Sequence, residues 1–282
     1  MVGILAEEIH DNRFLRLIRN MLTAGYLEDW KWNATLSGAP QGGVVSPVLS
    51  NIYLHKLDAY VETVLVPQYT QGIIRRRNPD YLRVTRKLAR ARRSGDRAQA
   101  RDLLRQQRAL PTGDPDDPAY RRLHYSRYAD DHLLGFTGPK AEAEAIKDQL
   151  AAFLRDELKL ELNHDKTLIT HARTRAARYL GYEILTQHND SKVTGGGRSV
   201  NGTIGLRVPL DVIKAKCAPY RRHGKPWHRP AMQNLDDYDI VRVYGAEYRG
   251  VVQYYLLAAD VWRLDRLRQD AQTSMLKTLG AP

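Results

Sequence analysis

The segment Tyr125–Phe136, with the sequence Tyr-Ser-Arg-Tyr-Ala-Asp-Asp-His-Leu-Leu-Gly-Phe, constrains the fold more than any other part of this chain. Apolar and aromatic residues lie on both sides of a short polar centre. This arrangement predicts two short strands within 123–136 that are joined by a tight turn. Such a turn places two neighbouring carboxylates, Asp130 and Asp131, at the end of a hairpin.

The adjacent carboxylates have two interpretations. They repel each other unless a cation neutralises them, and hard oxygen ligands on a rigid hairpin suit Mg²⁺ or Mn²⁺. A pair of such ions can activate an attacking hydroxyl group and stabilise a leaving pyrophosphate. The alternative is a solvent-exposed Asp-Asp turn, which is common in hairpins. Taken alone, the pair favours this second interpretation, so the surrounding sequence has to decide.

The rest of the chain alternates between helical and extended patterns, which predicts an α+β fold. Residues 177–185 have the pattern of a strand. The glycine-rich segment 188–205 predicts a linker or a flexible hairpin. Helical spacing of apolar residues extends over 5–22 (with Gly25 as a stop signal), 47–61 and 141–158, and from 208 onward, most clearly over 238–279.

The chain is strongly basic, since 44 Lys and Arg against 32 Asp and Glu give a formal net charge of +12. A charge of this size indicates a polyanionic partner, either nucleic acid or a membrane surface. No apolar run approaches the roughly 18 residues of a spanning helix, and the N-terminal residues lack a signal-peptide pattern. The single cysteine, Cys217, excludes an internal disulfide framework. Together these features predict a soluble, cytoplasmic protein.

Most of the excess charge lies between Arg75 and Arg122, where fifteen Arg and Lys face six Asp. The middle of this segment, 81–110, predicts a helix or a helix pair with a break at Ser94-Gly95. A solvated helical excursion is one interpretation. The other, which we favour, is a phosphate-contacting arm, because the arginine fork matches phosphate oxygens. Its candidate contacts begin with Arg75, Arg76 and Arg77.

A second basic stretch, 214–229, contains six Lys and Arg and no acidic residue, and it includes Tyr220 and Trp227. Interleaved cations and aromatic rings suit single-stranded RNA, whose bases stack on rings while its phosphates pair with cations. The candidate contacts are Arg221, Arg222 and Trp227. A metal site formed by Cys217, His223 and His228 is a weak alternative, because three ligands lack a fourth nearby.

Seven motifs occur in a fixed order along the chain. They are Gly-Ala-Pro-Gln-Gly-Gly-Val-Val-Ser-Pro at 38–47, Asn-Ile-Tyr-Leu-His-Lys-Leu-Asp at 51–58, the Tyr-Ala-Asp-Asp box at 128–131, Leu-Asn-His-Asp-Lys-Thr at 162–167, Tyr-Leu-Gly-Tyr at 179–182, and Tyr-Gly-Ala-Glu-Tyr-Arg-Gly-Val-Val-Gln-Tyr-Tyr at 244–255, followed by Ser-Met-Leu-Lys-Thr-Leu at 274–279. In this order the set resembles the reverse transcriptases encoded by group II introns. The resemblance covers nearly the whole chain.

The resemblance implies a right-hand polymerase palm with partial fingers, built from an antiparallel sheet plus helices, followed by an α-helical thumb. Residues 1–187 would form partial fingers and palm with a basic helical excursion at 69–122. Residues 188–207 would be a linker or flexible hairpin, and 208–282 a truncated thumb like the maturase region, domain X. The implied activity is RNA-directed DNA synthesis with maturase-type binding of intron RNA.

The family's functional residues carry over by position. Asp130 and Asp131 match the metal-binding aspartates, and Lys166 matches a basic residue that assists the departing pyrophosphate. The implied cofactor is Mg²⁺ or Mn²⁺. The implied partners are template or intron RNA, a DNA primer and deoxynucleotide triphosphates, with no membrane. The residues matching the nucleotide and primer sites are Pro40, Gln41, Gly42, Tyr128, Leu180 and Gly181.

One departure from the family's pattern affects the expected activity. Family members carry a further palm strand upstream, with an aspartate that completes the metal site. None of the acidic residues before Gly38 is expected inside an apolar strand; they are Glu7, Glu8, Asp11, Glu28 and Asp29. We therefore expect a fragment with little polymerase activity of its own. The alternative function is a non-catalytic, maturase-like module that binds RNA and assists intron splicing.

Overall fold

The computed structural model describes residues 1–34, 44–189, 192–194 and 197–280. They form two compact units, Met1–Thr167 and Leu168–Pro282, each with helices and small antiparallel sheets. This mixture agrees with the predicted α+β class. The division falls after Thr167, whereas the sequence placed a domain boundary after residue 187. In the described part of the chain, no helix combines the length and the apolar character that a membrane crossing demands.

The first unit begins with two short helices, α1 (Val2–Ala6) and α2 (Asn12–Thr23), where the sequence predicted one. The helix breaks because the Asp11 carboxylate caps α2, accepting hydrogen bonds from the backbone N–H groups of Arg13 and Phe14. A hairpin of β1 (Tyr26–Glu28) and β2 (Lys31–Asn33) follows, which the sequence did not predict. Glu28 therefore belongs to a strand, and its turn is the left-handed pair Asp29-Trp30.

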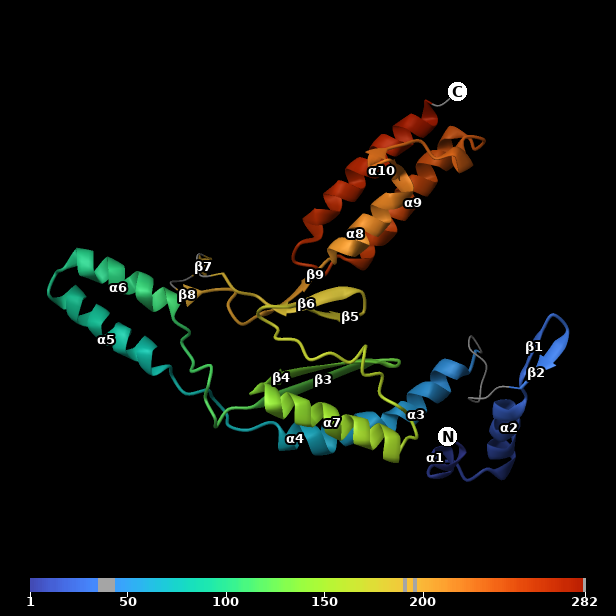
Figure 1. Ribbon diagram of the computed structural model, residues 1–282, viewed down its shortest axis with the longest axis horizontal. Coiled ribbons are helices and arrows are strands. Elements are labelled where there is room, and N and C mark those ends of the chain that lie inside the picture. The colour runs from blue at the N-terminus through green and yellow to red at the C-terminus, as the bar shows by residue number, and fades with distance from the viewer. Residues whose placement is uncertain (35–43, 190–191, 195–196, 281–282) are drawn as a thin grey trace. The chain divides into compact units, whose positions relative to one another are not determined.

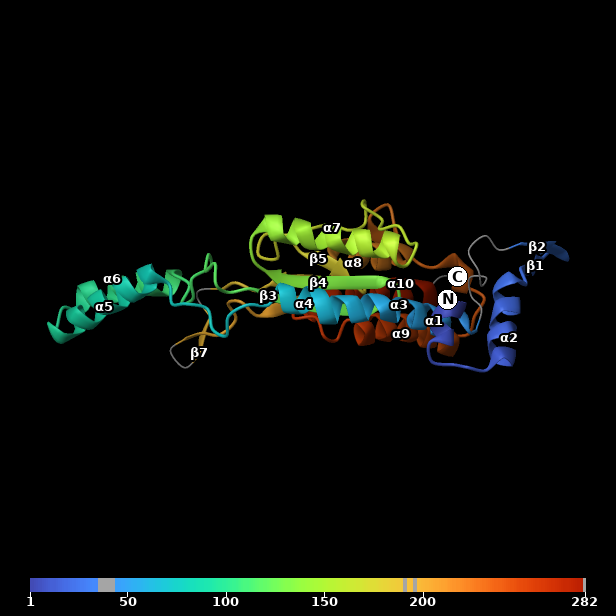
Figure 2. The same cartoon turned by 90° about the horizontal axis from the view of Figure 1, so that it is seen from below.

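The centre of this unit is a two-stranded sheet covered by helices on one face. Strand β3 (Arg122–Tyr128) pairs antiparallel with β4 (Asp131–Thr137), which confirms the predicted hairpin. One long helical stretch packs on it together with α7 (Lys140–Asp156), as Figure 2 shows. This stretch consists of α3 (Ser46–Tyr60), a π-helical segment (Val61–Leu65) and α4 (Val66–Gln68). Their shared core consists of Leu57, Val61, Leu65, Leu123, Ile146, Leu150, Leu154 and Leu158.

The basic excursion folds as a helical hairpin of α5 (Pro79–Arg93) and α6 (Arg97–Ala109), which lie side by side (Figure 1). The predicted break is confirmed, because Gly95 takes the left-handed conformation at a φ of 73° and Asp96 caps α6. A small core of Leu88, Ala91 and Leu103 holds the two helices together. Isolated bridges, Gln71 to Arg121 and Arg77 to Gly113, join the two connecting segments to each other.

The second unit contains an antiparallel sheet in the order β5 (Ala177–Tyr179), β6 (Tyr182–Thr186), β9 (Ile204–Arg207). The single strand predicted over 177–185 is therefore a hairpin that turns at Leu180-Gly181. The segment 188–207, which the sequence predicted as a linker or a flexible hairpin, ends in strand β9, and β9 pairs with β6 along four residue pairs. Between them lies a short hairpin of β7 (Val193–Thr194) and β8 (Gly197–Arg198).

Three helices complete the second unit: α8 (Leu210–Cys217), α9 (Asp237–Tyr254) and α10 (Asp265–Leu279). The hairpin β10 (Arg221–Arg222) and β11 (Lys225–Pro226) lies between α8 and α9 in sequence, and 3₁₀ turns cover Ala218–Tyr220, Pro230–Met232 and Val261–Leu264. The helices share an apolar core that includes Val208, Ile213, Tyr244, Leu264 and Leu267. Helical structure after residue 208 is thus confirmed.

Candidate functional site

The two aspartates lie at the tip of the β3–β4 hairpin, as the sequence predicted. Asp131 opens β4 opposite Tyr128, and Asp130 lies in the turn between them. Ala129, which precedes the pair, has a φ of 54°, in the left-handed region that is unfavourable for a residue with a Cβ atom. The tip therefore holds an unusual backbone conformation that needs support from its surroundings.

Strand alternation determines which side chains share a face of this hairpin. Leu123, Tyr125, Leu134 and Phe136 all pack into the core with the covering helices. Tyr128 and Asp131 have the opposite parity and are exposed, as is Asp130. The Asp131 carboxylate and the Tyr128 ring thus lie on the side of the hairpin that the helices leave uncovered, and Asp130 is exposed in the turn beside them. They are available there to a large ligand.

Arg127 supports the tip from the covered side (its side chain is 11% exposed). Its guanidinium donates two hydrogen bonds to the Asp58 carboxylate of α3, from Nε at 2.7 Å and from Nη2 at 2.6 Å. Its Nη1 donates to the Ala129 carbonyl oxygen at 2.6 Å and to the Asn51 side-chain oxygen at 3.1 Å. Arg127 therefore ties the left-handed residue before Asp130 to helix α3.

The charges of Arg127 and Asp58 balance each other. The hydrogen bonds from Arg127 hold the pKa of the Asp58 carboxyl below its ordinary value, although partial burial opposes this. The Tyr125 hydroxyl donates to the same carboxylate at 2.9 Å, and burial raises the pKa of this tyrosine. Asp58 thus remains a carboxylate that Arg127 neutralises, separate from the pair at the tip.

The donor set at the tip fits part of a magnesium site. Two exposed neighbouring carboxylates offer the hard oxygen atoms that Mg²⁺ prefers, with room for water and phosphate oxygens. Within the described residues, no group of three or more His, Cys, Asp or Glu side chains could hold a metal ion. Asp130 and Asp131 therefore account for two ligands, and the described part of the chain supplies no third carboxylate beside them.

The other predicted site residues of the first unit are placed as follows. Pro40, Gln41 and Gly42 lie outside the described residues. Lys166 lies in an exposed turn after α7, where its backbone N–H donates to the Asn163 side-chain oxygen at 3.1 Å. The structure therefore places Lys166 in a loop that the Asn163 side chain caps, with the lysine exposed.

In the second unit, the predicted primer-binding turn Leu180-Gly181 is held by helix α9. The Tyr254 hydroxyl donates to the Leu180 carbonyl oxygen at 2.8 Å, and the Tyr255 hydroxyl donates to the Gly181 carbonyl oxygen at 3.1 Å. Gly181 has a φ of 73°, and a Cβ atom there would lie 3.0 Å from the Tyr254 hydroxyl oxygen. The pair Tyr254-Tyr255 thus fixes the turn, and a side chain at its second position would strain the backbone and crowd Tyr254.

The structure changes which cations of the first basic segment are available. The Arg76 side chain pairs with Asp114 at 2.6 Å, and the Arg75 guanidinium lies 4.9 Å from the centre of the Tyr120 ring. Both therefore help to hold the base of the arm, although the Arg76 side chain stays 60% exposed, and Arg77 is exposed as well. The exposed cations of the arm are on its two helices: Arg83, Arg86, Lys87, Arg90, Arg92, Arg93, Arg97, Arg101, Arg105 and Arg108.

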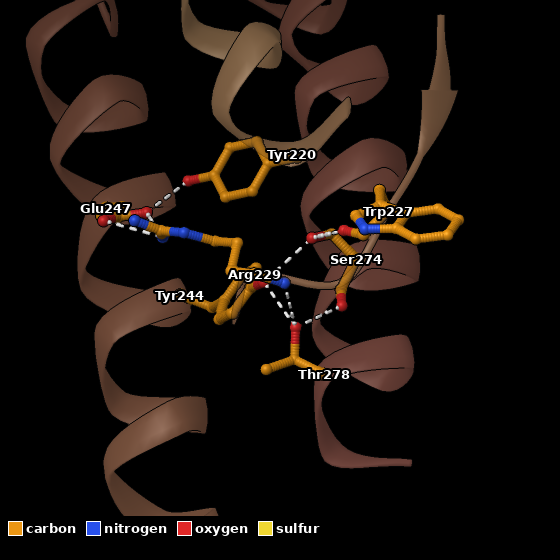
Figure 3. A network of polar contacts seen from close by, with 7 residues as sticks. All are labelled: Tyr220, Trp227, Arg229, Tyr244, Glu247, Ser274 and Thr278. Atoms are coloured by element: carbon orange, nitrogen blue, oxygen red, sulfur yellow. Dashed lines mark hydrogen bonds and ion pairs between the residues drawn. The ribbon is translucent and has the colours of Figure 1, made fainter. Parts of the chain in front are cut away.

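The second basic stretch is divided in the same way. Arg221 pairs with Asp270 of α10 at 2.7 Å. Arg229 pairs with Glu247 of α9 at 2.8 Å (Figure 3). Tyr220 is buried and donates its hydroxyl hydrogen to Glu247, so its ring is not a stacking platform. Arg222 and Trp227 remain exposed. Of the aromatic and cationic side chains predicted to contact RNA, these two fit that role best.

The weak metal interpretation of Cys217, His223 and His228 is wrong. Cys217 is buried in the core of the second unit, where burial raises the pKa of its thiol to about 11. A protonated, buried thiol is a poor metal ligand. The sequence did not identify Asp58 and Arg127 as a pair. The only signal was their presence in two separate motifs, and pairing across 69 residues leaves no local pattern.

No protein-family model matches this chain. Several curated proteins are similar to it in sequence. The group II intron-encoded protein LtrA of Lactococcus lactis subsp. cremoris is 33% identical over 299 residues, covering 100% of this chain and 50% of LtrA. The COX1/OXI3 intron 1 protein of Saccharomyces cerevisiae is 32% identical over 278 residues, covering 92% of this chain and 33% of that protein.

A third relative is the mitochondrial nuclear intron maturase 4 of Arabidopsis thaliana, which is 26% identical over 241 residues and covers 85% of this chain and 29% of its own length. The chain spans about half the length of LtrA and less of the other two. The similarity to LtrA extends from end to end, through the paired aspartates and the helices of the second unit. This chain therefore belongs to the group II intron-encoded reverse transcriptase and maturase family.

Proposed function

We propose that this chain is the part of a group II intron-type reverse transcriptase that presents the paired aspartates of the palm to the primer end and binds RNA beside them. The observation that carries the proposal is the β3–β4 hairpin. Its tip exposes Asp130 in the turn and Asp131 on the uncovered face, inside a chain that aligns with LtrA over its whole length. A solvated Asp-Asp turn would need no largely covered arginine to hold it.

The residues of the tip have separate roles in this proposal. Asp130 and Asp131 would hold Mg²⁺ or Mn²⁺, and such ions supply activation of the primer hydroxyl group and charge neutralisation for the leaving pyrophosphate. Arg127 fixes the turn through the Ala129 carbonyl oxygen, so that the two carboxylates keep one position relative to α3. Tyr128, on the same face as Asp131, would contact the nucleotide or primer.

The α5–α6 hairpin is the proposed main contact with RNA phosphates. Its two helices carry ten exposed Arg and Lys side chains, whereas its acidic residues are Asp80, Asp96 and Asp102. Two of these acidic residues form exposed pairs, Asp80 with Arg83 and Asp102 with Arg105, which are weak in water. Most of the positive charge therefore remains available, and arginine is well suited to phosphate.

Primer extension on an RNA template with Mg²⁺ or Mn²⁺ tests the catalytic part. Each ion needs several oxygen ligands in fixed geometry, and the described residues supply two neighbouring carboxylates. We therefore expect no template-dependent extension by the isolated chain. The control is Asp148→Ala, because Asp148 is an exposed residue of α7. Nucleotide incorporation that disappears in Asp130→Ala but persists in Asp148→Ala would show instead that two aspartates suffice.

A further inference from the structure

The short hairpin β10–β11 is a separately built surface feature of the second unit. Its two strands pair Arg221 with Pro226 and Arg222 with Lys225. The turn between them, His223-Gly224, has both residues in the left-handed conformation, with φ values of 51° and 76°. This is the backbone of a tight two-residue turn, so the side chains of the hairpin project from a fixed frame.

Side chains of helix α10 hold this hairpin, mainly by hydrogen bonds to backbone carbonyl groups of the hairpin and the residue after it. The Ser274 hydroxyl donates to the Trp227 carbonyl oxygen at 2.5 Å, and Lys277 Nζ donates to the Pro226 carbonyl oxygen at 2.9 Å. The Arg221 guanidinium donates to both carboxylate oxygens of Asp270. Figure 3 shows the Trp227 carbonyl group turned toward Ser274, while the indole ring extends away from the polar network. The ring is therefore held in place without being buried.

An open hollow of about 320 Å³ lies beside this ring. Trp227 is 40% exposed, although its indole is the largest apolar side chain in the stretch. The Arg222 guanidinium lies 5.5 Å from the centre of the indole ring, and the His228 ring lies 4.8 Å from it at an interplanar angle of 35°. The residues that line the hollow are Pro219, Arg221, Arg222, Trp227, His228, Arg229, Pro230 and Ala231.

The charge of the hollow indicates an anionic occupant. None of its lining residues is acidic, and the two arginines with ion-pair partners, Arg221 and Arg229, use Asp270 and Glu247 outside it. Within the described part of the chain, no carboxylate lies within ion-pair distance of Arg222. Its neighbour Lys225 is exposed on the paired strand. A phosphate group beside Arg222 would thus meet positive charge that the fold has not already neutralised.

We propose that this hollow binds one unpaired RNA nucleotide, with its base stacked on Trp227 and its phosphate on Arg222. The proposal rests on the RNA-binding function proposed above and names where a single strand is held. An indole face can stack on any base, but in a duplex both faces of each internal base are already covered by neighbouring bases. The hollow therefore selects single-stranded or looped RNA over the duplex.

The test compares Trp227→Ala with Trp262→Ala in the full chain, using a short oligouridylate and a blunt RNA duplex as probes. Trp262 is a matched control, because it belongs to the same unit, is 70% exposed and has the Arg263 guanidinium 5.8 Å from its ring centre. Loss of one stacked base weakens binding by about 5- to 150-fold. We expect that loss for oligouridylate in Trp227→Ala alone, with duplex affinity unchanged.

Two further variants separate stacking from folding and from charge. Trp227→Tyr keeps an aromatic face and should restore most of the oligouridylate affinity. Arg222→Gln should make the slope of log K against log[salt] less negative by about 0.7, whereas Trp227→Ala should leave the slope unchanged. Tryptophan fluorescence gives a direct readout, since quenching by oligouridylate should be smaller in Trp227→Ala than in Trp262→Ala.

Equal affinity losses in the two tryptophan variants, or equal losses for both probes, would overturn the nucleotide site. If the unchanged chain binds RNA with a strong salt dependence and Trp227→Ala binds oligouridylate as tightly, only this site fails. If the unchanged chain binds neither probe, the proposed RNA-binding function fails with it.

Discussion

Arg127 joins three groups at once: the Asp58 carboxylate, the Asn51 side-chain amide and the Ala129 carbonyl of the strained turn. A surface arginine would not make this set of contacts. Replacing Arg127 by Gln leaves the Asp58 carboxylate without its cation and the Ala129 carbonyl without its donor. Hydrogen bonds to charged groups contribute about 1.5–3 kcal/mol. We expect Arg127→Gln to lower the free energy of unfolding of the first unit by roughly that amount, measured by urea denaturation.

The matched control for this variant is Arg155→Gln. Arg155 also makes two hydrogen bonds to an aspartate, Asp156, but both side chains are more than half exposed. Exposed pairs of this kind contribute about 0–1 kcal/mol. A stability loss that is equal in the two variants would contradict the role assigned to Arg127.

The identities of individual residues in this site could be predicted only where the signal was local. The adjacent Asp130 and Asp131 between two apolar runs predicted a hairpin tip, and the structure has one. Which arginines remain available was not predictable, since Asp114 and Asp270, the partners of Arg76 and Arg221, are 38 and 49 residues away in sequence. Net charge is visible in a sequence, whereas its neutralisation depends on tertiary contacts.

The β5–β6 hairpin illustrates how an element was misassigned. Residues 177–185 have the composition of one strand, and the turn inside them has only Gly181 as a signal. The turn is held there by the hydroxyls of Tyr254, the last residue of α9, and of Tyr255, which follows it; they donate to the carbonyl oxygens of Leu180 and Gly181. Contacts from 74 residues away thus override the local pattern.

Gly181→Ala tests this turn against a second glycine with similar backbone strain. Both Gly181 and Gly202 have positive φ, but a Cβ atom at Gly202 would meet no atom within 4 Å. We expect Gly202→Ala to cost about 1–2 kcal/mol from the left-handed backbone alone. Gly181→Ala should cost more, because its Cβ also crowds Tyr254, and thermal unfolding of the second unit measures the difference. Equal losses would contradict the proposed fixing of the turn.

Each of the two units contains an aspartate whose ionised form is stabilised by arginine. Arg127 lowers the pKa of Asp58 in the first unit, and Arg178 lowers the pKa of Asp211 in the second to about 2, from an ordinary value of 3.8. A carboxyl whose folded pKa is depressed stabilises the fold above its unfolded pKa and loses that contribution as the pH falls through the folded value.

We therefore expect the second unit to lose thermal stability between about pH 4 and pH 2, and the first unit to lose it as the pH falls below about 4. Melting temperatures measured across this range check the prediction. Asp211→Asn should lower the melting temperature of the second unit at pH 7 and flatten its decline below pH 4. A decline with the same slope in the variant would show that Asp211 does not contribute.

For the whole chain, the fold class and the order of the elements could be predicted from the sequence better than the boundary between the two units. Paired aspartates, a basic helical arm and a C-terminal helical region all appear where the sequence places them. The boundary differs because β5, β6 and β9 form one sheet, and Ala259 beyond α9 donates its backbone N–H to Leu206 of β9. Sheet pairing thus assigns these residues to the second unit, although their sequence continues from the first.

The central claim is that the positive charge of the α5–α6 hairpin binds RNA phosphates, and RNA affinity across a salt series tests it most directly. If about six phosphates are contacted, log K should fall against log[salt] with a slope of about −4 to −5. Replacing Arg86, Arg90 and Arg93, exposed residues at helical spacing on α5, by Gln should make that slope less negative by about two. A flat salt dependence of the unchanged chain, or an identical slope in the variant, would contradict the account and leave these arginines as a solvated surface.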